Sequence, residues 1–365
     1  MTEFHGLQFL SLIFISILAW LLPKNWQLTA VSSTTVLLLG WFSLESLILL
    51  TTSSLLVFYG SHASRRMGIL VPILIIYCSI QYLLIDILQQ HGERNWQTLS
   101  FLGLAYYTCR NIHYTIEAYT GRIKSELVAF WHYQFFWPVM ITGPIHRYQN
   151  FNRQCQRRRR EPVNTYLSLN RIVIGYAKVV ILANYIIATE LTNLIDSSTS
   201  TLMIDSFLVS AKDWMYLYLQ FSGWSDIAIG FSLLMGIKIE ENFNRPYLAT
   251  NLIEFWQRWH MTLSSWCKDY VFTPILAVSR KPFIAIIFAM SAMGLWHEVS
   301  LYYLLWGVYH ASGIAVCRIF QNLKSDNFFE KNYWKNLSRV LTFTFIVAGA
   351  PIITLVEKTL LRLIL

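Results

Sequence analysis

Ser291-Ala292-Met293-Gly294-Leu295-Trp296-His297 closes an uncharged, apolar run that begins near residue 283, and this run decides the kind of fold. Small and apolar residues are typical of a helix packed inside a membrane bundle, because small side chains let neighbouring helices approach closely. An imidazole at the end of such a run would be partly desolvated, which favours its neutral, basic form. Bilayers seldom hold ionisable groups without a function, so we interpret His297 as a candidate active-site residue.

The composition of the chain supports a membrane protein. Of its 365 residues 55% are hydrophobic and 13% are charged, whereas a soluble domain averages roughly 25% charged residues. Many apolar runs approach the ~20 residues that cross a hydrocarbon core. We therefore expect an all-α, polytopic membrane protein with about 10–12 helices. The first run, near residues 7–22, lacks a basic start and a small-residue cleavage site, so we expect it to remain as a helix.

The net charge of +9 has two interpretations. Cytoplasmic loops of membrane proteins carry excess Lys and Arg, and the basic loops near residues 65–66, 122–124 and 147–160 fit that topology. The same charge would suit docking of an anionic partner. We expect no nucleic-acid partner, because the basic residues do not gather in a soluble domain with interleaved aromatics. The five cysteines show no CxxC spacing, so we expect free thiols.

A break in the apolar span at residues 126–142 suggests a cavity. Were this span to cross fully, the basic loops on its two sides would face opposite compartments. Gly143 and Pro144 interrupt the helix, since proline forfeits a backbone hydrogen bond. A re-entrant hairpin would keep both basic loops on the cytoplasmic side. Broken backbone at membrane depth is tolerated only beside protein or a water-filled cavity, so we expect a cavity beside Gly143 and Pro144.

The stretch 238–276 is too polar to cross lipid as one helix, so we expect short helices, partly interfacial. Asn251 is a plausible N-cap for the helix that carries His260. If one helix runs through 254–266, residues three or four apart share a face. Trp256, His260 and Ser264 would then line one side.

Two further pairs follow from the same helical spacing. Glu254 and Arg258 would form an i,i+4 ion pair, and Phe255 would stack on Trp259. A lone membrane histidine is often a helix-to-helix hydrogen-bond donor, and for His260 this structural role is somewhat favoured over function.

The histidine spacing does not indicate a metal centre. No two of the nine histidines stand closer in sequence than His297 and His310. On one continuous helix these two would point away from each other. We expect no bound metal.

Five ordered stretches resemble the membrane-bound O-acyltransferase family, in particular its bacterial branch of alginate O-acetyltransferases and D-alanyl transfer proteins of the teichoic acid system. They are residues 143–148, 221–226, 241–247, 255–260 and 294–297, and the pattern Trp306-Gly307…His310 also fits. The resemblance implies a single domain over residues 1–365, with its motif core at about 100–320. It also implies a bowl of helices around a central tunnel.

By this resemblance His297 matches the catalytic histidine of the family and His260 matches its partner position. The residues expected to line the tunnel or to contact substrate are Trp256, Arg258, Trp296, Ser264, Gly143, Pro144, Asn244 and Asp226. Where the bacterial branch usually has glycine after the catalytic histidine, this chain has Glu298, which leaves the acyl group and the acceptor open.

The implied reaction moves an acetyl or aminoacyl group from a cytoplasmic thioester to a hydroxyl of an envelope polysaccharide, glycolipid or partner. The donor would be acetyl-CoA or an acyl carrier protein thioester, used as substrate, and no cofactor is expected to be bound. His297 would act as general base or, less simply, would form an acyl-enzyme. His260, the Trp256 indole N–H or a backbone amide would stabilise the oxyanion.

The expected location is the bacterial cytoplasmic (inner) membrane, as a multi-pass protein in contact with lipid. Expected partners are acyl-CoA or a small acidic carrier protein on the cytoplasmic face, together with a periplasmic or extracellular acyltransferase or a small membrane peptide. The alternative is a lipid-linked glycan flippase or transporter with a histidine-based proton relay. A third hypothesis is a scaffold protein without catalytic activity, and the presence of both histidines argues against it.

Overall fold

The computed structural model describes residues 2–64, 67–91, 102–159, 161–196, 202–323 and 332–364. These residues form helices, turns and loops, with no strand among them. The chain divides into two compact units. Residues 1–175 and 224–240 form the first unit, and residues 176–223 and 241–365 form the second.

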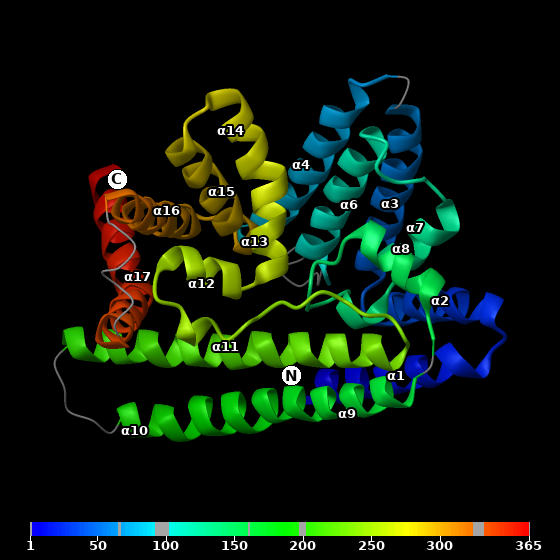
Figure 1. The fold of residues 1–365 in the computed structure, drawn as a ribbon, viewed down its shortest axis with the longest axis horizontal. Coiled ribbons are helices and arrows are strands. Elements are labelled where there is room, and N and C mark those ends of the chain that lie inside the picture. Colours follow the sequence, from blue (N-terminus) through cyan, green and yellow to red (C-terminus); the bar gives the residue numbers. More distant parts are fainter. Residues whose placement is uncertain are drawn as a thin grey trace. The chain divides into compact units, whose positions relative to one another are not determined.

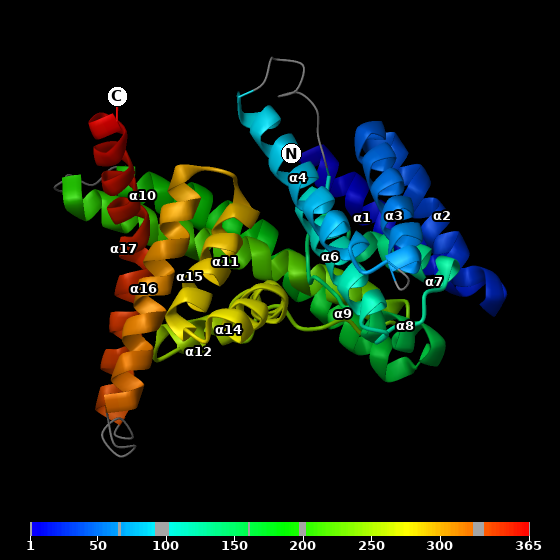
Figure 2. The same cartoon turned by 90° about the horizontal axis from the view of Figure 1, so that it is seen from above.

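The first unit is a bundle in which α3, α4 and α6 run side by side (Figure 1, Figure 2). Its helices are α1 (Thr2–Leu21), α2 (Lys24–Phe42), α3 (Leu44–Ser64), α4 (Leu70–His91), α6 (Leu104–Tyr119), α7 (Leu127–Gln134), the 3₁₀ turn η1 (Trp137–Val139), α8 (Tyr148–Arg157) and α9 (Pro162–Tyr176).

The α3 helix shows why this bundle belongs in lipid. It buries the small polar residues Ser46, Ser53 and Ser61, while Ile48 and Leu56 are 55% and 53% exposed. A helix at the surface of a soluble protein has the reverse arrangement, with its apolar stripe facing the core. Small residues inside and branched aliphatic residues outside are the pattern of helices that pack against one another in a bilayer.

Within the described residues, four helical stretches are long and apolar enough to cross a membrane. They are Leu44–Ser64, Leu70–Gln89, Val163–Leu191 and Trp334–Leu363. The prediction of an all-α, polytopic membrane protein is confirmed.

The second unit holds the two histidine segments singled out in the sequence. Its helices are η2 (Ala177–Leu191, π-helical), α10 (Thr192–Asp196), most of α11 (Leu202–Leu234), η3 (Pro246–Leu248), α12 (Leu252–Arg258), α13 (Met261–Cys267), η4 (Lys268–Phe272), α14 (Thr273–Ser279), α15 (Pro282–His297), α16 (Leu301–Leu323) and α17 (Asn332–Ile364).

The α11 helix runs through Gly223 and Gly230 without a break, because an internal glycine costs only about 1 kcal/mol in a helix. One predicted helix boundary is wrong. The span expected over 126–142 ends at Gln134, where α7 stops before the η1 turn. Pro138 has no backbone N–H and disfavours helical geometry in the residue before it, so the chain breaks earlier than Gly143.

Close backbone approach fixes the α15–α16 pair. A Cβ atom on Gly294 would lie 2.1 Å from the backbone oxygen of Tyr303, and one on Gly307 would lie 2.6 Å from that of Met290. Glycine at both positions therefore permits contact that any larger residue would prevent. The α12 helix contacts α16 and α13 contacts α15, so the short polar helices pack on this pair.

Candidate functional site

A break between α12 and α13 places His260. The α12 helix ends at Arg258, Trp259 is extended, and His260 has φ 40° and ψ 52°, in the left-handed region. A non-glycine residue is uncommon there, although histidine is among the types that adopt this region more often. The prediction of one helix through 254–266 is therefore wrong, and Trp256, His260 and Ser264 do not share a helical face.

Asn242 compensates this break and fixes the His260 ring. Its backbone oxygen accepts the Met261 N–H at 2.8 Å. Its Oδ1 accepts from the Thr262 hydroxyl at 2.8 Å and lies 3.0 Å from Nδ1 of His260. The Thr262 backbone N–H, which can only donate, also points at Oδ1, 3.4 Å away, and this supports the amide orientation.

This arrangement assigns the tautomer of His260. Because Oδ1 of Asn242 is an acceptor, Nδ1 of His260 carries the hydrogen, and Nε2 of the neutral ring holds the lone pair. Nε2 is buried and has no hydrogen-bond partner among the described residues. The rings of Phe221 and Trp296 meet the imidazole edge-to-face, with centroids 4.7 and 5.4 Å away.

The surroundings keep His260 neutral. Burial lowers the pKa of His260 well below its ordinary value, and a positive charge on the nearby His297 would lower that pKa further. The site therefore presents an uncharged imidazole at neutral pH.

His297, the last residue of α15, has an exposed side chain. Its ring is flanked by Trp296, Tyr303 and Trp306, with centroids 5.0, 5.6 and 5.6 Å away. Tyr303 stacks at 25°, whereas the two indoles stand edge-on. The described residues give the ring nitrogens of His297 no hydrogen-bond partner, so these nitrogens are available to a substrate.

Trp296 connects the two histidines. Its ring lies 5.4 Å from that of His260 and 5.0 Å from that of His297, edge-to-face with both. The two imidazoles thus contact one indole within one unit. A tunnel at this point stays a prediction.

A third histidine, His310, joins the same cluster through Trp306. The Trp306 ring lies 5.6 Å from His297 and 4.5 Å from His310. Residues 298–300 separate α15 from α16, so the two histidines do not lie on one continuous helix, and the geometry expected for one helix does not apply. Trp256 packs in this part of the cluster, 5.3 Å from His310, and not beside His260. Among the described residues, no three His, Cys, Asp or Glu side chains are grouped as metal ligands would be.

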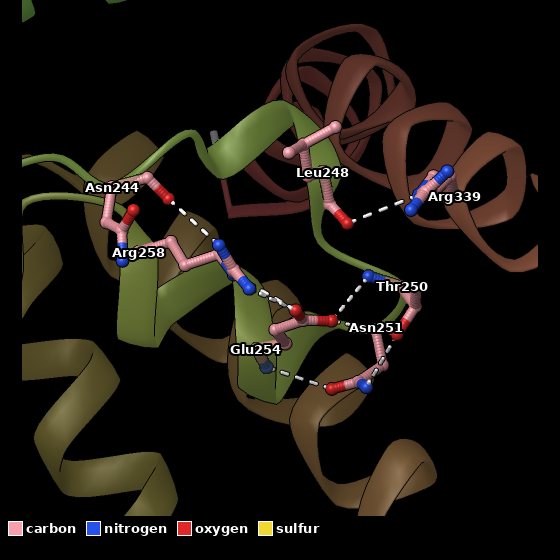
Figure 3. Close-up of polar contacts among 7 residues, drawn as sticks. All are labelled: Asn244, Leu248, Thr250, Asn251, Glu254, Arg258 and Arg339. Atoms are coloured by element: carbon pink, nitrogen blue, oxygen red, sulfur yellow. Dashed lines mark hydrogen bonds and ion pairs between the residues drawn. The ribbon is translucent and has the colours of Figure 1, made fainter. Parts of the chain in front are cut away.

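Polar contacts join α12 to the segment 244–251 that precedes it (Figure 3). The side chain of Asn251 accepts the Glu254 N–H at 2.9 Å, which confirms the predicted N-cap. The Glu254–Arg258 ion pair, at 2.8 Å, and the Phe255–Trp259 stack, at 5.5 Å, are also as predicted.

Arg258 and Asn244 belong to this same scaffold. The Asn244 N–H donates to the Arg258 carbonyl at 2.9 Å, and Nη1 of Arg258 donates back to the Asn244 carbonyl at 3.2 Å. Burial opposes ionisation of Glu254, but hydrogen bonds from Thr250 and Arg258 outweigh it and lower the pKa of this carboxyl. These residues fix the backbone that carries His260.

The remaining predicted residues have structural contacts. The Ser264 hydroxyl donates to the Trp259 carbonyl at 3.1 Å. Gly143, Pro144 and Asp226 belong to the first unit. There, Asp226 pairs with Arg171 at 2.9 Å, and Gly143 has φ 126°, where a Cβ would meet Ala228 at 3.0 Å.

Sequence reasoning did not single out Asn242, Tyr303 and Phe221 as site residues. Asn242 lies inside the stretch 241–247 that resembles the family, but nothing in its spacing shows that it would reach His260. Tyr303 stands six residues after His297, and only the turn between α15 and α16 brings the two rings together.

Comparison with known proteins identifies the fold around these histidines. A model of the membrane-bound O-acyltransferase family matches residues 12–356. The chain belongs to the membrane-bound O-acyltransferase family. Its relatives include the teichoic acid D-alanyltransferase of Bacillus subtilis, 32% identical over 69% of this chain and 68% of the relative.

Two other relatives of this O-acyltransferase act on different polymers by name. A probable alginate O-acetylase of Pseudomonas aeruginosa is 29% identical over 68% of this chain and 47% of the relative. A peptidoglycan O-acetyltransferase of Helicobacter pylori is 32% identical over 58% and 41%. The chain thus spans about half the length of these two proteins. The family and the names of the relatives support an O-acyltransferase in a membrane.

Proposed function

We propose that the protein transfers an acyl group from a thioester, presented on the cytoplasmic side, to a hydroxyl of an envelope polysaccharide, glycolipid or partner protein. One observation carries the proposal. His297 is exposed, its ring nitrogens have no hydrogen-bond partner in the part of the chain that the structure describes, and its ring packs on Trp296, which also packs on the buried, neutral ring of His260. The names of relatives that act on teichoic acid, alginate and peptidoglycan support the class of acceptor.

In the proposed reaction His297 acts as general base. It takes the proton of the acceptor hydroxyl as the oxygen forms a bond to the thioester carbonyl carbon. The tetrahedral intermediate then expels the thiolate, which receives the proton from the His297 imidazolium. A positioned base of this kind contributes typically about 10²–10⁴-fold to the rate.

We assign His260 to positioning. Its Nδ1–H is committed to Asn242, so the neutral ring has no N–H left for an oxyanion. The ring instead braces Trp296, which packs on His297. Because His260 stays uncharged, it does not oppose the positive charge that His297 gains in the transition state.

We propose acetyl-CoA or an acidic carrier-protein thioester as the donor, and the cytoplasmic (inner) membrane of a bacterium as the location. Basic side chains of the first unit would receive an anionic donor. Arg153, Arg157 and Arg159 are exposed. Arg158 is not part of this surface, since it is buried, donates to the Ala19 carbonyl at 3.1 Å and lies over the Trp20 ring. A periplasmic acyltransferase or a small membrane peptide would act as a partner in passing the acyl group to its acceptor.

The test is to complement a deletion strain with wild-type protein or His297→Ala and to measure ester-linked acyl groups in the envelope. Wild-type protein should increase the amount of ester-linked acyl groups above that of the deletion strain. We expect no such increase with His297→Ala, when both proteins are present in the membrane in equal amounts. Transport of an unmodified lipid-linked glycan into proteoliposomes, with no ester formed, would instead support the flippase.

A further inference from the structure

Glu298 places a carboxylate directly after His297. The residue ends α15: its backbone is extended, with φ −165° and ψ 142°, and its N–H donates to the Gly294 carbonyl at 3.3 Å. The Ser300 N–H donates to the Glu298 carbonyl at 3.0 Å. The backbone of Glu298 is therefore held in place by the turn that joins α15 to α16.

The carboxylate itself has no protein partner. Among the described residues, no cation lies within ion-pair distance of Glu298, and no donor reaches its side-chain oxygens. It does not orient the imidazole of His297, since no hydrogen bond joins the two side chains. A half-buried carboxylate without a partner is costly unless a ligand or water compensates it.

Tyr303 connects this carboxylate with His297. The Tyr303 ring stacks on the imidazole at 5.6 Å. Burial raises the pKa of the Tyr303 phenol, and the negative charge of Glu298 raises that pKa further. His297 is therefore flanked by three aromatic rings, Trp296, Tyr303 and Trp306, and the next residue in the chain carries a carboxylate whose charge acts on one of them, Tyr303.

An unpaired carboxylate among aromatic rings is the chemistry that binds an ammonium group. The carboxylate supplies charge, and the ring faces attract a cation by their quadrupoles, worth about 0.5–2 kcal/mol. In an aminoacyl thioester the ammonium is bonded to the carbon next to the reacting carbonyl. If the acceptor hydroxyl attacks the thioester carbonyl next to His297, the ammonium of the acyl group would thus lie beside Glu298.

We propose that Glu298, with Tyr303, selects a positively charged acyl group, so that the protein transfers an aminoacyl group and not acetyl. This inference rests on the proposed function, since it concerns the acyl group of that same reaction. Acetyl carries no charge and would leave the carboxylate uncompensated.

The first experiment identifies the transferred group. The deletion strain is complemented with wild-type protein, His297→Ala, Glu298→Gln or the control Asp213→Asn, whose side chain is 64% exposed on α11. Mild base releases ester-linked acyl groups from the envelope, and mass spectrometry identifies them. We expect wild type and the control to add an amino acid, Glu298→Gln to add at least tenfold less, and His297→Ala to add none.

The outcomes separate the two proposals. Release of acetate in place of an amino acid would overturn the role of Glu298 and leave acyl transfer intact. Equal ester content in wild type and His297→Ala would overturn the proposed function as well.

The second experiment tests charge with matched probes. Membrane vesicles that contain the protein and its native acceptor receive the alanyl or propionyl thioester of N-acetylcysteamine, which differ by the amine. We expect wild type to prefer alanyl at least tenfold, and Glu298→Gln to lose most of that preference while remaining folded by detergent size-exclusion chromatography. An unchanged preference in Glu298→Gln would contradict the proposal.

Discussion

Nδ1 of His260 lies 3.0 Å from Oδ1 of Asn242, and this contact determines which ring nitrogen of His260 carries the proton. It also links residues 18 positions apart, at the point where the α12–α13 backbone is broken. Asn242 thus supports both the conformation and the charge state of the histidine.

Asn242→Leu should therefore lower stability and activity together. The substitution leaves the buried Nδ1–H and the Thr262 hydroxyl without an acceptor, at a cost of about 1–3 kcal/mol for a buried unsatisfied group. Thermal unfolding in detergent measures the change. The control Asn336→Ala, at an exposed position, should leave the melting temperature almost unchanged. A melting temperature equal to that of wild type in Asn242→Leu would refute the assigned role.

His260 should make the folded protein less stable as the pH falls. Its pKa is lower in the folded protein than in the unfolded chain, where it is about 6.5. As pH falls below about 6.5 the unfolded chain binds the proton first, so the stability present above that pH is progressively lost. We expect the melting temperature of His260→Gln to fall less between pH 7 and pH 5 than that of wild type. Parallel curves for the two proteins would exclude this assignment.

Gly294→Ala should prevent α15 from packing on α16. The added methyl would meet the backbone oxygen of Tyr303, which cannot move as a flexible side chain can. We expect little folded protein in the membrane, as measured by fluorescence-detected size-exclusion chromatography. In the matched variant Gly40→Ala the new Cβ meets a terminal carbon of Leu47 at 3.1 Å, and that side chain can shift. Equal yields of the two variants would argue against the close approach.

Asn251→Ala should cost about 1 kcal/mol, the usual value of a lost N-cap. Asn251→Ser should restore most of the loss, because a serine hydroxyl also accepts from a backbone N–H near the helix start. Chemical or thermal unfolding of both variants provides the comparison. If Asn251→Ser and Asn251→Ala destabilise the protein equally, the hydrogen bond from the Glu254 N–H to the Asn251 side chain does not stabilise the helix as proposed.

Short-range features of the site could be predicted from the sequence. The Asn251 cap, the Glu254–Arg258 pair and the Phe255–Trp259 stack all depend on spacings of three or four residues along α12 and its two end caps. Such contacts follow from the 3.6-residue period alone.

Features that depend on distant residues could not be predicted in the same way. The helix break at Trp259 and His260 contains no proline or glycine, and it is stabilised by Asn242 from another segment. The convergence of His297 and His310 on Trp306 requires the turn at residues 298–300, which also lacks both residues. Tertiary contacts override local preference at both places.

The rate of acyl transfer by His297→Ala, compared with wild type in vesicles that contain the native acceptor, tests whether His297 is the general base. We predict a loss of at least 10²-fold, as expected when a general base is removed, with an unchanged melting temperature. Transfer at the wild-type rate by a folded His297→Ala protein would contradict the assignment of His297 as the base.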